Sequence, residues 1–153
     1  MVIIIDYGMG NLASISNMIK KMGGSSVITR DKEIILNASK LILPGVGSFK
    51  EGIKNLHELG LISVLEKAVI EKKIPILGIC LGMQLMTNYS EEGGIHGLGW
   101  INADTIKFKC NNIKVPHIGW NDIRVNKSTR LIDEKNYRFY FVHSYYCVPE
   151  IKK

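Results

Sequence analysis

The sequence predicts an α/β fold, in which a parallel sheet carries helices on both faces and is followed by a β-rich C-terminal part. Short apolar segments alternate with segments of helical periodicity through about Asn88, as in repeated βαβ units. These apolar segments are continuous rather than alternating, which is typical of strands buried on both faces of a sheet. After Asn88 no long helical pattern appears, and short strand candidates alternate with loops.

Each element of the first part has a local signal. Residues 1–6 (MVIIID) are β-branched and apolar and predict a buried strand, and residues 26–29 and 40–43 predict two more. Between the first two strands, apolar residues recur at helical spacing, and Gly23-Gly24 ends the predicted helix. These apolar residues are Leu12, Ile15, Met18, Ile19 and Met22.

Two more helices and a fourth strand are predicted next. The first helix contains Phe49, Ile53 and Leu56, and the second contains Leu61, Val64, Leu65, Ala68 and Val69. Residues 75–79 predict the fourth strand, and the chain is helical again from Met83. In the C-terminal part the strand candidates are 105–108, 122–125 and 137–142. No linker or low-complexity tract divides the chain, so we expect a single domain over residues 1–153.

The composition argues against several classes of protein. Of the 153 residues, 46% are hydrophobic, which indicates a globular chain. No apolar run approaches the roughly 20 residues of a membrane span, and the opening segment does not resemble a signal peptide, so we expect a cytoplasmic protein. The net charge of +6 shows no basic stripe interleaved with aromatic residues, which argues against nucleic acid as a partner. The three cysteines lack CxxC spacing, so neither a disulfide framework nor a zinc site is predicted.

Cys80 lies in the segment GICLG, between a predicted strand and a predicted helix. This is the cysteine version of the GxSxG nucleophile elbow, in which a sharp turn strains the backbone of the nucleophile and flanking glycines avoid clashes. A helix N-terminus stabilises an anion such as a thiolate, and the backbone N–H of Leu81 is placed to meet a developing oxyanion. A buried structural cysteine is the alternative, but the strand–turn–helix setting favours a nucleophile.

Two glycine turns also lie between predicted strands and helices. The first, GMGNLA at residues 8–13, matches the GxGxxA pattern of dinucleotide-binding proteins, and Asp31 lies near the expected acidic position. We favour an ordinary tight turn, whose glycines supply positive φ. The second, PGVGS at residues 44–48, either exposes backbone N–H groups to an anion or is a turn with Ser48 as helix N-cap, and both interpretations stay open.

A cysteine nucleophile needs a base, which is commonly a histidine. The chain has four, and spacing alone identifies none of them as the base: His57, His96, His117 and His143. In the segment FYFVHSYY, alternation places Phe139, Phe141 and His143 on one face of a strand. This segment is either a strand that ends at the surface or one that presents Ser144 and Tyr145 to a ligand.

Taken together, the motifs resemble the class I glutamine amidotransferases. They are DYGMGN, PGVG, GICLGMQ, the SEEGGIHGLGW loop, VPHIGWN and FYFVHSYY, in this order over essentially the whole chain. GICLGMQ is common to the family, whereas DYGMGN, VPHIGWN and FYFVHSYY are more specific to members that serve a (βα)8-barrel synthase subunit in histidine biosynthesis. The resemblance implies a flavodoxin-like fold and hydrolysis of L-glutamine to glutamate and ammonia through a γ-glutamyl thioester on Cys80, without cofactor or metal.

The resemblance also implies roles for other residues. Six of them serve glutamine: Leu81, Val46 and Gly47 through the oxyanion hole, and Gln84, Ser144 and Tyr145 through substrate binding. Three face the (βα)8-barrel partner of a heterodimer, which receives the ammonia: Asn11, Trp120 and Tyr140. In this interpretation the GMGN turn serves the subunit interface rather than a nucleotide.

One element of the resemblance has no counterpart in the chain. The family's catalytic base is a histidine in a C-terminal HPE-type segment with a glutamate partner, and the 153 residues contain no HPE. We therefore expect a C-terminally incomplete copy with little or no glutaminase activity by itself. Besides the nucleotide-binding domain, two alternatives stay open. One is a paralogous subunit that feeds ammonia to a sugar amidotransferase in surface polysaccharide synthesis, and the other is a non-catalytic binding subunit.

Overall fold

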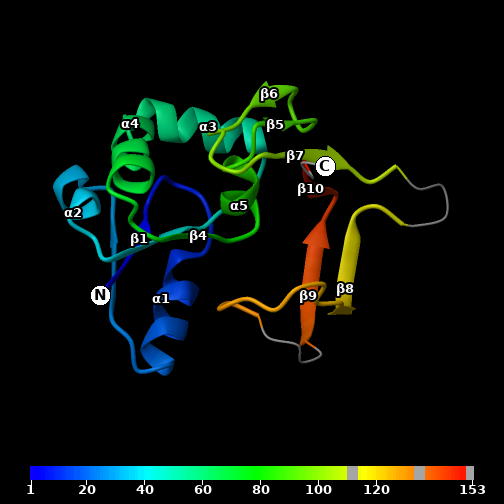
Figure 1. Ribbon diagram of the computed structural model, residues 1–153, viewed down its shortest axis with the longest axis horizontal. Helices are drawn as coiled ribbons and strands as arrows, with labels where there is room; N and C mark the ends of the chain where they lie inside the picture. Colours follow the sequence, from blue (N-terminus) through cyan, green and yellow to red (C-terminus); the bar gives the residue numbers. More distant parts are fainter. Residues whose placement is uncertain (110–113, 133–136, 151–153) are drawn as a thin grey trace. The chain divides into compact units, whose positions relative to one another are not determined.

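The computed structural model describes residues 1–109, 114–132 and 137–150 (Figure 1). The chain forms two compact units, Met1–Ile106 with Cys147–Lys153, and Lys107–Tyr146. The expected single domain over residues 1–153 stays a prediction. Among the described residues, no helix has the length and apolar character that crossing a membrane requires.

A four-stranded parallel sheet forms the centre of the first unit. Its strand order is β2 (Ser26–Thr29), β1 (Val2–Ile5), β3 (Lys40–Leu43) and β4 (Ile76–Gly78). Val2 pairs with Ser26 on one side and with Lys40 on the other, and Leu41 pairs with Ile76. All four strands were predicted, with bounds within two residues, because each is a short apolar run between turn signals.

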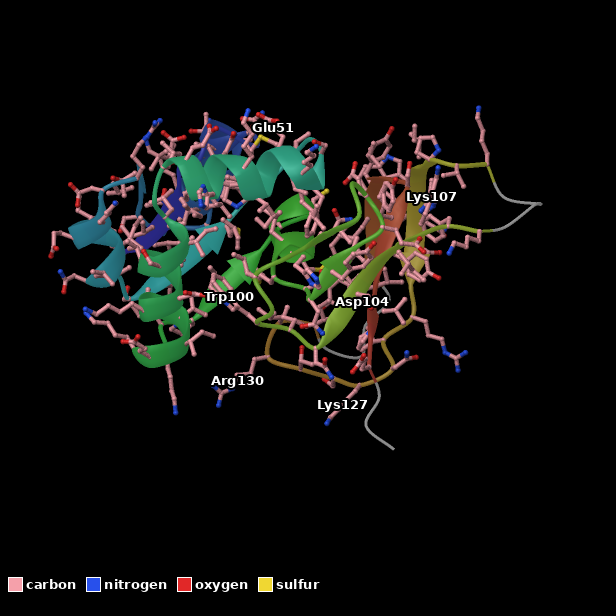
Figure 2. The ribbon with its side chains drawn as sticks, turned by 90° about the horizontal axis from the view of Figure 1, so that it is seen from above. Glu51, Trp100, Asp104, Lys107, Lys127 and Arg130 are labelled. Carbon is pink, nitrogen blue, oxygen red and sulfur yellow. The ribbon has the colours of Figure 1, made fainter. Side chains whose placement is uncertain are left out.

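Five helices connect and flank these strands (Figure 1). They are α1 (Leu12–Lys21), α2 (Lys32–Leu36), α3 (Phe49–Glu58), α4 (Ile62–Glu66), which continues as a π-helical segment η1 (Lys67–Glu71), and α5 (Leu81–Leu85). Figure 2 shows Glu51 projecting outward from α3, while Phe49 and Leu56 of the same helix are buried in the core. The sequence did not predict α2, because five residues are too few to show a helical repeat.

Short strands follow the parallel sheet. β10 (Tyr145–Pro149), β7 (Ala103–Lys107), β5 (Tyr89–Ser90) and β6 (Ile95–His96) form a second sheet in this order. The parallel sheet, its helices and this β-rich part confirm the predicted α/β fold class. The predicted strand over 105–108 corresponds to β7, while β5 and β6 were missed because two-residue strands carry no periodic signal.

A hairpin-like pair of strands, β8 (His117–Ile123) and β9 (Tyr137–His143), lies in the second unit. In its antiparallel register His117 faces His143, Gly119 faces Phe141 and Trp120 faces Tyr140. The prediction for 137–142 is confirmed, whereas the strand predicted over 122–125 lies over 117–123 instead. Glycine and asparagine within HIGWN have low strand propensity, which explains why the sequence placed that strand too late.

Candidate active site at Cys80

Cys80 occupies the turn between β4 and α5, and its side chain is exposed. Its backbone has φ +53° and ψ −115°, a conformation that non-glycine residues rarely adopt. Such strain persists only where surrounding contacts maintain it, and it concentrates at functional sites. The strained elbow predicted from GICLG is therefore present in the structure.

The glycines on either side of Cys80 are required by close backbone contacts. A Cβ on Gly78 would lie 2.5 Å from Met83 Cα and 2.6 Å from its nitrogen. A Cβ on Gly82 would overlap the carbonyl oxygen of Leu43, at the end of β3. Since these neighbours are backbone atoms, no side-chain movement would make room, and the helix after Cys80 sits directly against the end of β3.

The loop that follows β3 starts beside this elbow. Pro44 and Gly45 are buried, whereas Val46 is 68% exposed and Gly47 has φ +129°. A Cβ on Gly45 would lie 2.8 Å from Leu81 Cβ and 2.9 Å from the Gly82 nitrogen. The structure thus brings the PGVG loop and the first turn of α5 together, as an oxyanion hole built from both segments requires.

The backbone N–H groups assigned to the oxyanion hole differ in their setting. Leu81 is the first residue of α5, so its N–H has no acceptor within the helix. Val46 and Gly47 belong to the exposed part of the loop, although a Cβ on Gly47 would lie 2.6 Å from Met9 Cε. Ser48 ends the loop as the N-cap of α3, its Oγ accepting a hydrogen bond from the Glu51 N–H at 3.3 Å.

Tyr7 and Glu92 contact the two ends of this loop, and sequence reasoning missed both. The Tyr7 hydroxyl donates to the Pro44 carbonyl at 2.5 Å, and a Glu92 carboxylate oxygen accepts the Phe49 N–H at 3.0 Å. Burial raises the pKa of Tyr7 well above its ordinary value, and the negative charge of Cys80 adds a smaller increase. The only sequence feature that could have drawn attention to Tyr7 is its position directly after β1. No feature of the sequence indicated that its side chain would contact Pro44.

The residues assigned to glutamine binding fall in both units. Gln84 is buried in α5, where its N–H donates to the Cys80 carbonyl at 3.2 Å. Ser144 and Tyr145 follow β9 in the second unit. The Ser144 carbonyl accepts from the Phe108 N–H at 3.1 Å. Their roles toward glutamine stay predictions.

A chain of hydrogen bonds runs between the histidines of the hairpin-like pair. His117 Nδ1 lies 3.0 Å from His143 Nε2, and His143 Nδ1 lies 2.9 Å from the Tyr145 carbonyl oxygen. Asn121 Nδ2 approaches His117 Nε2 at 3.5 Å. Alternation along β9 correctly placed His143 on the face of Phe139 and Phe141, but the sequence did not identify His117 as its partner. The other two histidines, His57 and His96, are exposed.

Trp120 and Tyr140, assigned to a partner interface, form an exposed aromatic pair. They are 63% and 56% exposed, and their rings meet edge to face with centroids 5.6 Å apart. Asn11, the third assigned residue, is the N-cap of α1, and its side chain accepts from the Ser14 N–H at 3.1 Å. The interface role of all three stays a prediction.

The GxGxxA turn has a structural explanation in the first unit. Gly8 and Gly10 have φ +81° and +90°, as favoured for a tight turn. Asp31 caps α2, its carboxylate accepting hydrogen bonds from the Glu33 and Ile34 N–H groups. The residues that suggested a dinucleotide site therefore serve the backbone of the βα turn and of α2.

The remaining cysteines lie away from the elbow in sequence. Cys147 is half-buried, and its sulfur lies 3.6 Å from Thr105 Oγ1. Burial raises the pKa of Cys147, and the hydrogen bond with Thr105 opposes this shift without reversing it. Cys110 lies outside the described residues.

Comparison with known proteins gives a consistent result. Residues 3–153 match the family model for glutamine amidotransferase class-I. The imidazole glycerol phosphate synthase subunit HisH 2 of Methanococcus maripaludis is 58% identical, over 100% of this chain and 77% of the relative. The subunit HisH 2 of Pseudomonas aeruginosa is 45% identical, over 98% of this chain and 76% of the relative.

A solved structure supports the fold independently. A crystal structure described as a glutamine amidotransferase superposes with a TM-score of 0.72 at 18% identity, over 93% of this chain and 71% of that one. At this identity the superposition shows a shared fold, while the family assignment rests on the closer relatives. The chain belongs to the class-I glutamine amidotransferases, within the family of imidazole glycerol phosphate synthase HisH subunits.

Proposed function

We propose that this chain is the glutaminase subunit of imidazole glycerol phosphate synthase. In this role Cys80 serves the hydrolysis of L-glutamine to glutamate and ammonia, and the ammonia passes to a (βα)8-barrel cyclase subunit that makes imidazole glycerol phosphate and AICAR in histidine biosynthesis. The expectation that the 153 residues by themselves have little or no glutaminase activity stays a prediction. One structural observation carries the proposal: an exposed cysteine at a strained strand–helix elbow, beside a glycine loop, in a chain 58% identical to a HisH subunit.

The reaction uses the elbow as follows. The Cys80 sulfur attacks the side-chain amide carbon of glutamine, and the carbonyl oxygen becomes an oxyanion. The N–H of Leu81, together with the N–H groups of Val46 and Gly47, stabilises this charge. Collapse of the tetrahedral intermediate breaks the C–N bond and releases ammonia, which leaves a γ-glutamyl thioester. Water then cleaves the thioester to glutamate and restores the thiol.

The acid–base step depends on a group beyond those at the elbow. The thiol proton must leave before attack, and the departing nitrogen must gain a proton. The resemblance assigns this work to a histidine of an HPE-type segment, which does not occur in the 153 residues. His143 is not a substitute in this proposal, because its Nδ1 faces the Tyr145 carbonyl and its Nε2 faces His117.

Glutamine specificity comes from three side chains in this proposal. Gln84 lies one helical turn after Cys80. Ser144 and Tyr145 supply hydrogen-bonding groups from the junction of β9 and β10. An amide substrate requires both donors and acceptors, which these side chains provide.

In this proposal the partner contacts Asn11 in the first unit and Trp120 and Tyr140 in the second unit. An exposed aromatic pair is typical of the residues that dominate protein–protein interfaces. In this proposal the two subunits form a heterodimer in the cytoplasm. Direct transfer within the heterodimer suits the chemistry, because ammonia released to solvent would be protonated to ammonium, and ammonium is not a nucleophile.

The test uses the full-length protein with its barrel partner. Glutaminase activity is measured for the wild-type protein, Cys80→Ala and Cys147→Ser, and labelling by a glutamine-analogue electrophile is located by mass spectrometry. We expect Cys80→Ala to abolish hydrolysis and labelling, and Cys147→Ser to retain both. Hydrolysis that survives in Cys80→Ala, or a wild-type complex without activity, would contradict the proposal.

A further inference from the structure

Tyr7 makes a contact that the nucleophile elbow itself does not require. It follows β1 by two residues and its side chain is fully buried. Its hydroxyl lies 2.5 Å from the carbonyl oxygen of Pro44, the first residue after β3. Since β1 and β3 are paired neighbours, this hydrogen bond joins the carboxyl ends of two adjacent parallel strands.

The direction of this hydrogen bond is unambiguous. A carbonyl oxygen only accepts, so the tyrosine must donate its proton. Burial and the nearby negative charge of Cys80 both raise the pKa of Tyr7, so the phenol stays protonated at neutral pH. The donor is therefore present in the pH range in which a cysteine nucleophile works.

A hydrogen bond at this carbonyl restricts the next peptide unit. The peptide group is planar, and in its trans form the Pro44 carbonyl and the Gly45 N–H point in opposite directions. Gly45 is also confined, because a Cβ there would lie 2.6 Å from the Tyr7 hydroxyl and 2.8 Å from Leu81 Cβ. The Pro44–Gly45 peptide is thus held in one orientation between Tyr7 and the elbow.

The other end of the loop is held separately. Ser48 caps α3, and the Glu92 carboxylate accepts a hydrogen bond from the Phe49 N–H at 3.0 Å. Between these two ends, Val46 and Gly47 are exposed. The two residues whose N–H groups are assigned to the oxyanion hole therefore lie between the two held ends of the loop.

We propose that Tyr7 is a positioning residue for the oxyanion loop, residues 45–47. By holding the Pro44–Gly45 peptide, its hydroxyl limits the orientations that the N–H groups of Val46 and Gly47 reach beside Cys80. This role rests on the proposed glutaminase function, because the oxyanion hole has meaning only for that reaction. Tyr7 does not touch glutamine; it acts through the loop backbone.

The role predicts a specific kinetic change. Hydrogen bonds to an oxyanion are stronger in the transition state than in the bound substrate, so poor loop positioning lowers kcat more than it raises KM. In the full-length protein with its barrel partner, we expect Tyr7→Phe to lower kcat for glutamine hydrolysis by about tenfold to a hundredfold. KM for glutamine should stay within about twofold of the wild-type value, as expected when an interaction made only in the transition state is lost.

Two controls separate positioning from a general structural effect. Tyr89→Phe removes the hydroxyl of a half-buried tyrosine on β5, and we expect it to leave kcat and KM unchanged. Alkylation of Cys80 by iodoacetamide needs the elbow but no oxyanion hole, so its rate should be the same in Tyr7→Phe and the wild-type protein. Backbone 15N relaxation should show lower order parameters at residues 45–47 in Tyr7→Phe than in Tyr89→Phe, with β1 unchanged.

The outcomes distinguish the two levels of the proposal. An active wild-type complex in which Tyr7→Phe retains kcat, or loses iodoacetamide reactivity in parallel with kcat, overturns the positioning role alone. A wild-type complex that does not hydrolyse glutamine overturns the proposed function and, with it, the role of Tyr7 in catalysis. A fall in kcat with constant KM, constant alkylation and a more mobile loop supports both.

Discussion

His117 and His143 form a direct hydrogen bond across β8 and β9, with His117 Nδ1 3.0 Å from His143 Nε2. The surrounding groups decide which nitrogen carries each proton. The Tyr145 carbonyl accepts from His143 Nδ1, so Nε2 of a neutral His143 is the acceptor and His117 Nδ1 the donor. Asn121 Nδ2, itself a donor, faces the remaining nitrogen of His117. All four groups are thereby arranged in one direction along the chain of hydrogen bonds.

This arrangement predicts the tautomers of both histidines. We expect both neutral rings to carry their proton on Nδ1, although free histidine usually prefers Nε2. Long-range 1H–15N correlation spectra report the protonated nitrogen directly, and exposed His57 serves as the internal reference. Finding the proton of neutral His143 on Nε2 would contradict the hydrogen bond to Tyr145.

Gly82 should be far less tolerant of substitution than a glycine with open space around it, such as Gly23. Its Cβ would overlap the Leu43 carbonyl oxygen, a backbone atom that cannot move aside without displacing β3. We expect Gly82→Ala to lower the free energy of unfolding by about 3 kcal/mol or to prevent folding, as overpacking against a rigid neighbour does. Urea denaturation followed by circular dichroism measures the change.

The matched control for Gly82 is Gly23→Ala. Gly23 has φ +79°, and no atom lies within 4 Å of the position of its Cβ. Only the left-handed backbone conformation opposes alanine there, at a cost of about 1 kcal/mol. Equal stability losses in the two variants would mean that the contact between α5 and β3 is looser than the structure shows.

The two described cysteines should differ in their reactivity with iodoacetamide. Burial raises the pKa of Cys147, so less of it is thiolate at a given pH, and its alkylation should reach half its maximal rate at a higher pH than that of an ordinary cysteine. Cys80 is exposed, so access does not limit its reaction. Peptide mass spectrometry after timed alkylation at pH 8 should show Cys80 modified first. Faster reaction at Cys147 would refute this order.

The exposed aromatic pair predicts a partner-binding hot spot. Trp120→Ala should weaken binding of the barrel subunit by about 2 kcal/mol, or about 30-fold in Kd, because large aromatic side chains dominate such interfaces. Phe139→Ala is the matched control, since Phe139 lies on the opposite face of β9 and is 44% exposed. Titration calorimetry would measure both. If Phe139→Ala weakened binding and Trp120→Ala did not, the interface would use the other face.

Much of the fold was predictable because its signals are local. The four parallel strands are short apolar runs, and α1 and α3 show a clear helical repeat. The elbow at Cys80 was predictable for the same reason, since GICLG contains the cysteine of the turn and its flanking glycines within five residues. The catalytic base could not be identified in this way. The resemblance assigns it to an HPE-type segment, and the 153-residue sequence contains no such segment.

The elements and contacts that the sequence did not predict depend on interactions between segments that are distant along the chain. Helix α2 and strands β5 and β6 are too short to show periodicity, and β8 contains glycine and asparagine, so tertiary pairing overrides weak local preference there. The Glu92 carboxylate accepts a hydrogen bond from the N–H of Phe49, the first residue of α3. The two residues are 43 positions apart, and nothing in the sequence near Glu92 indicates this contact.

Local signals in the amino-acid sequence were enough to place the four parallel strands, α1 and α3 along the chain, and to identify the strained turn at Cys80 with the glycines that permit it. These depend on backbone preferences and on contacts within a few residues. The hydrogen bond from Tyr7 to Pro44, 37 residues away, and the contact of His117 with His143 follow only from the folded chain. Strand order and register set those distances, and both are properties of the whole folded chain rather than of any one segment.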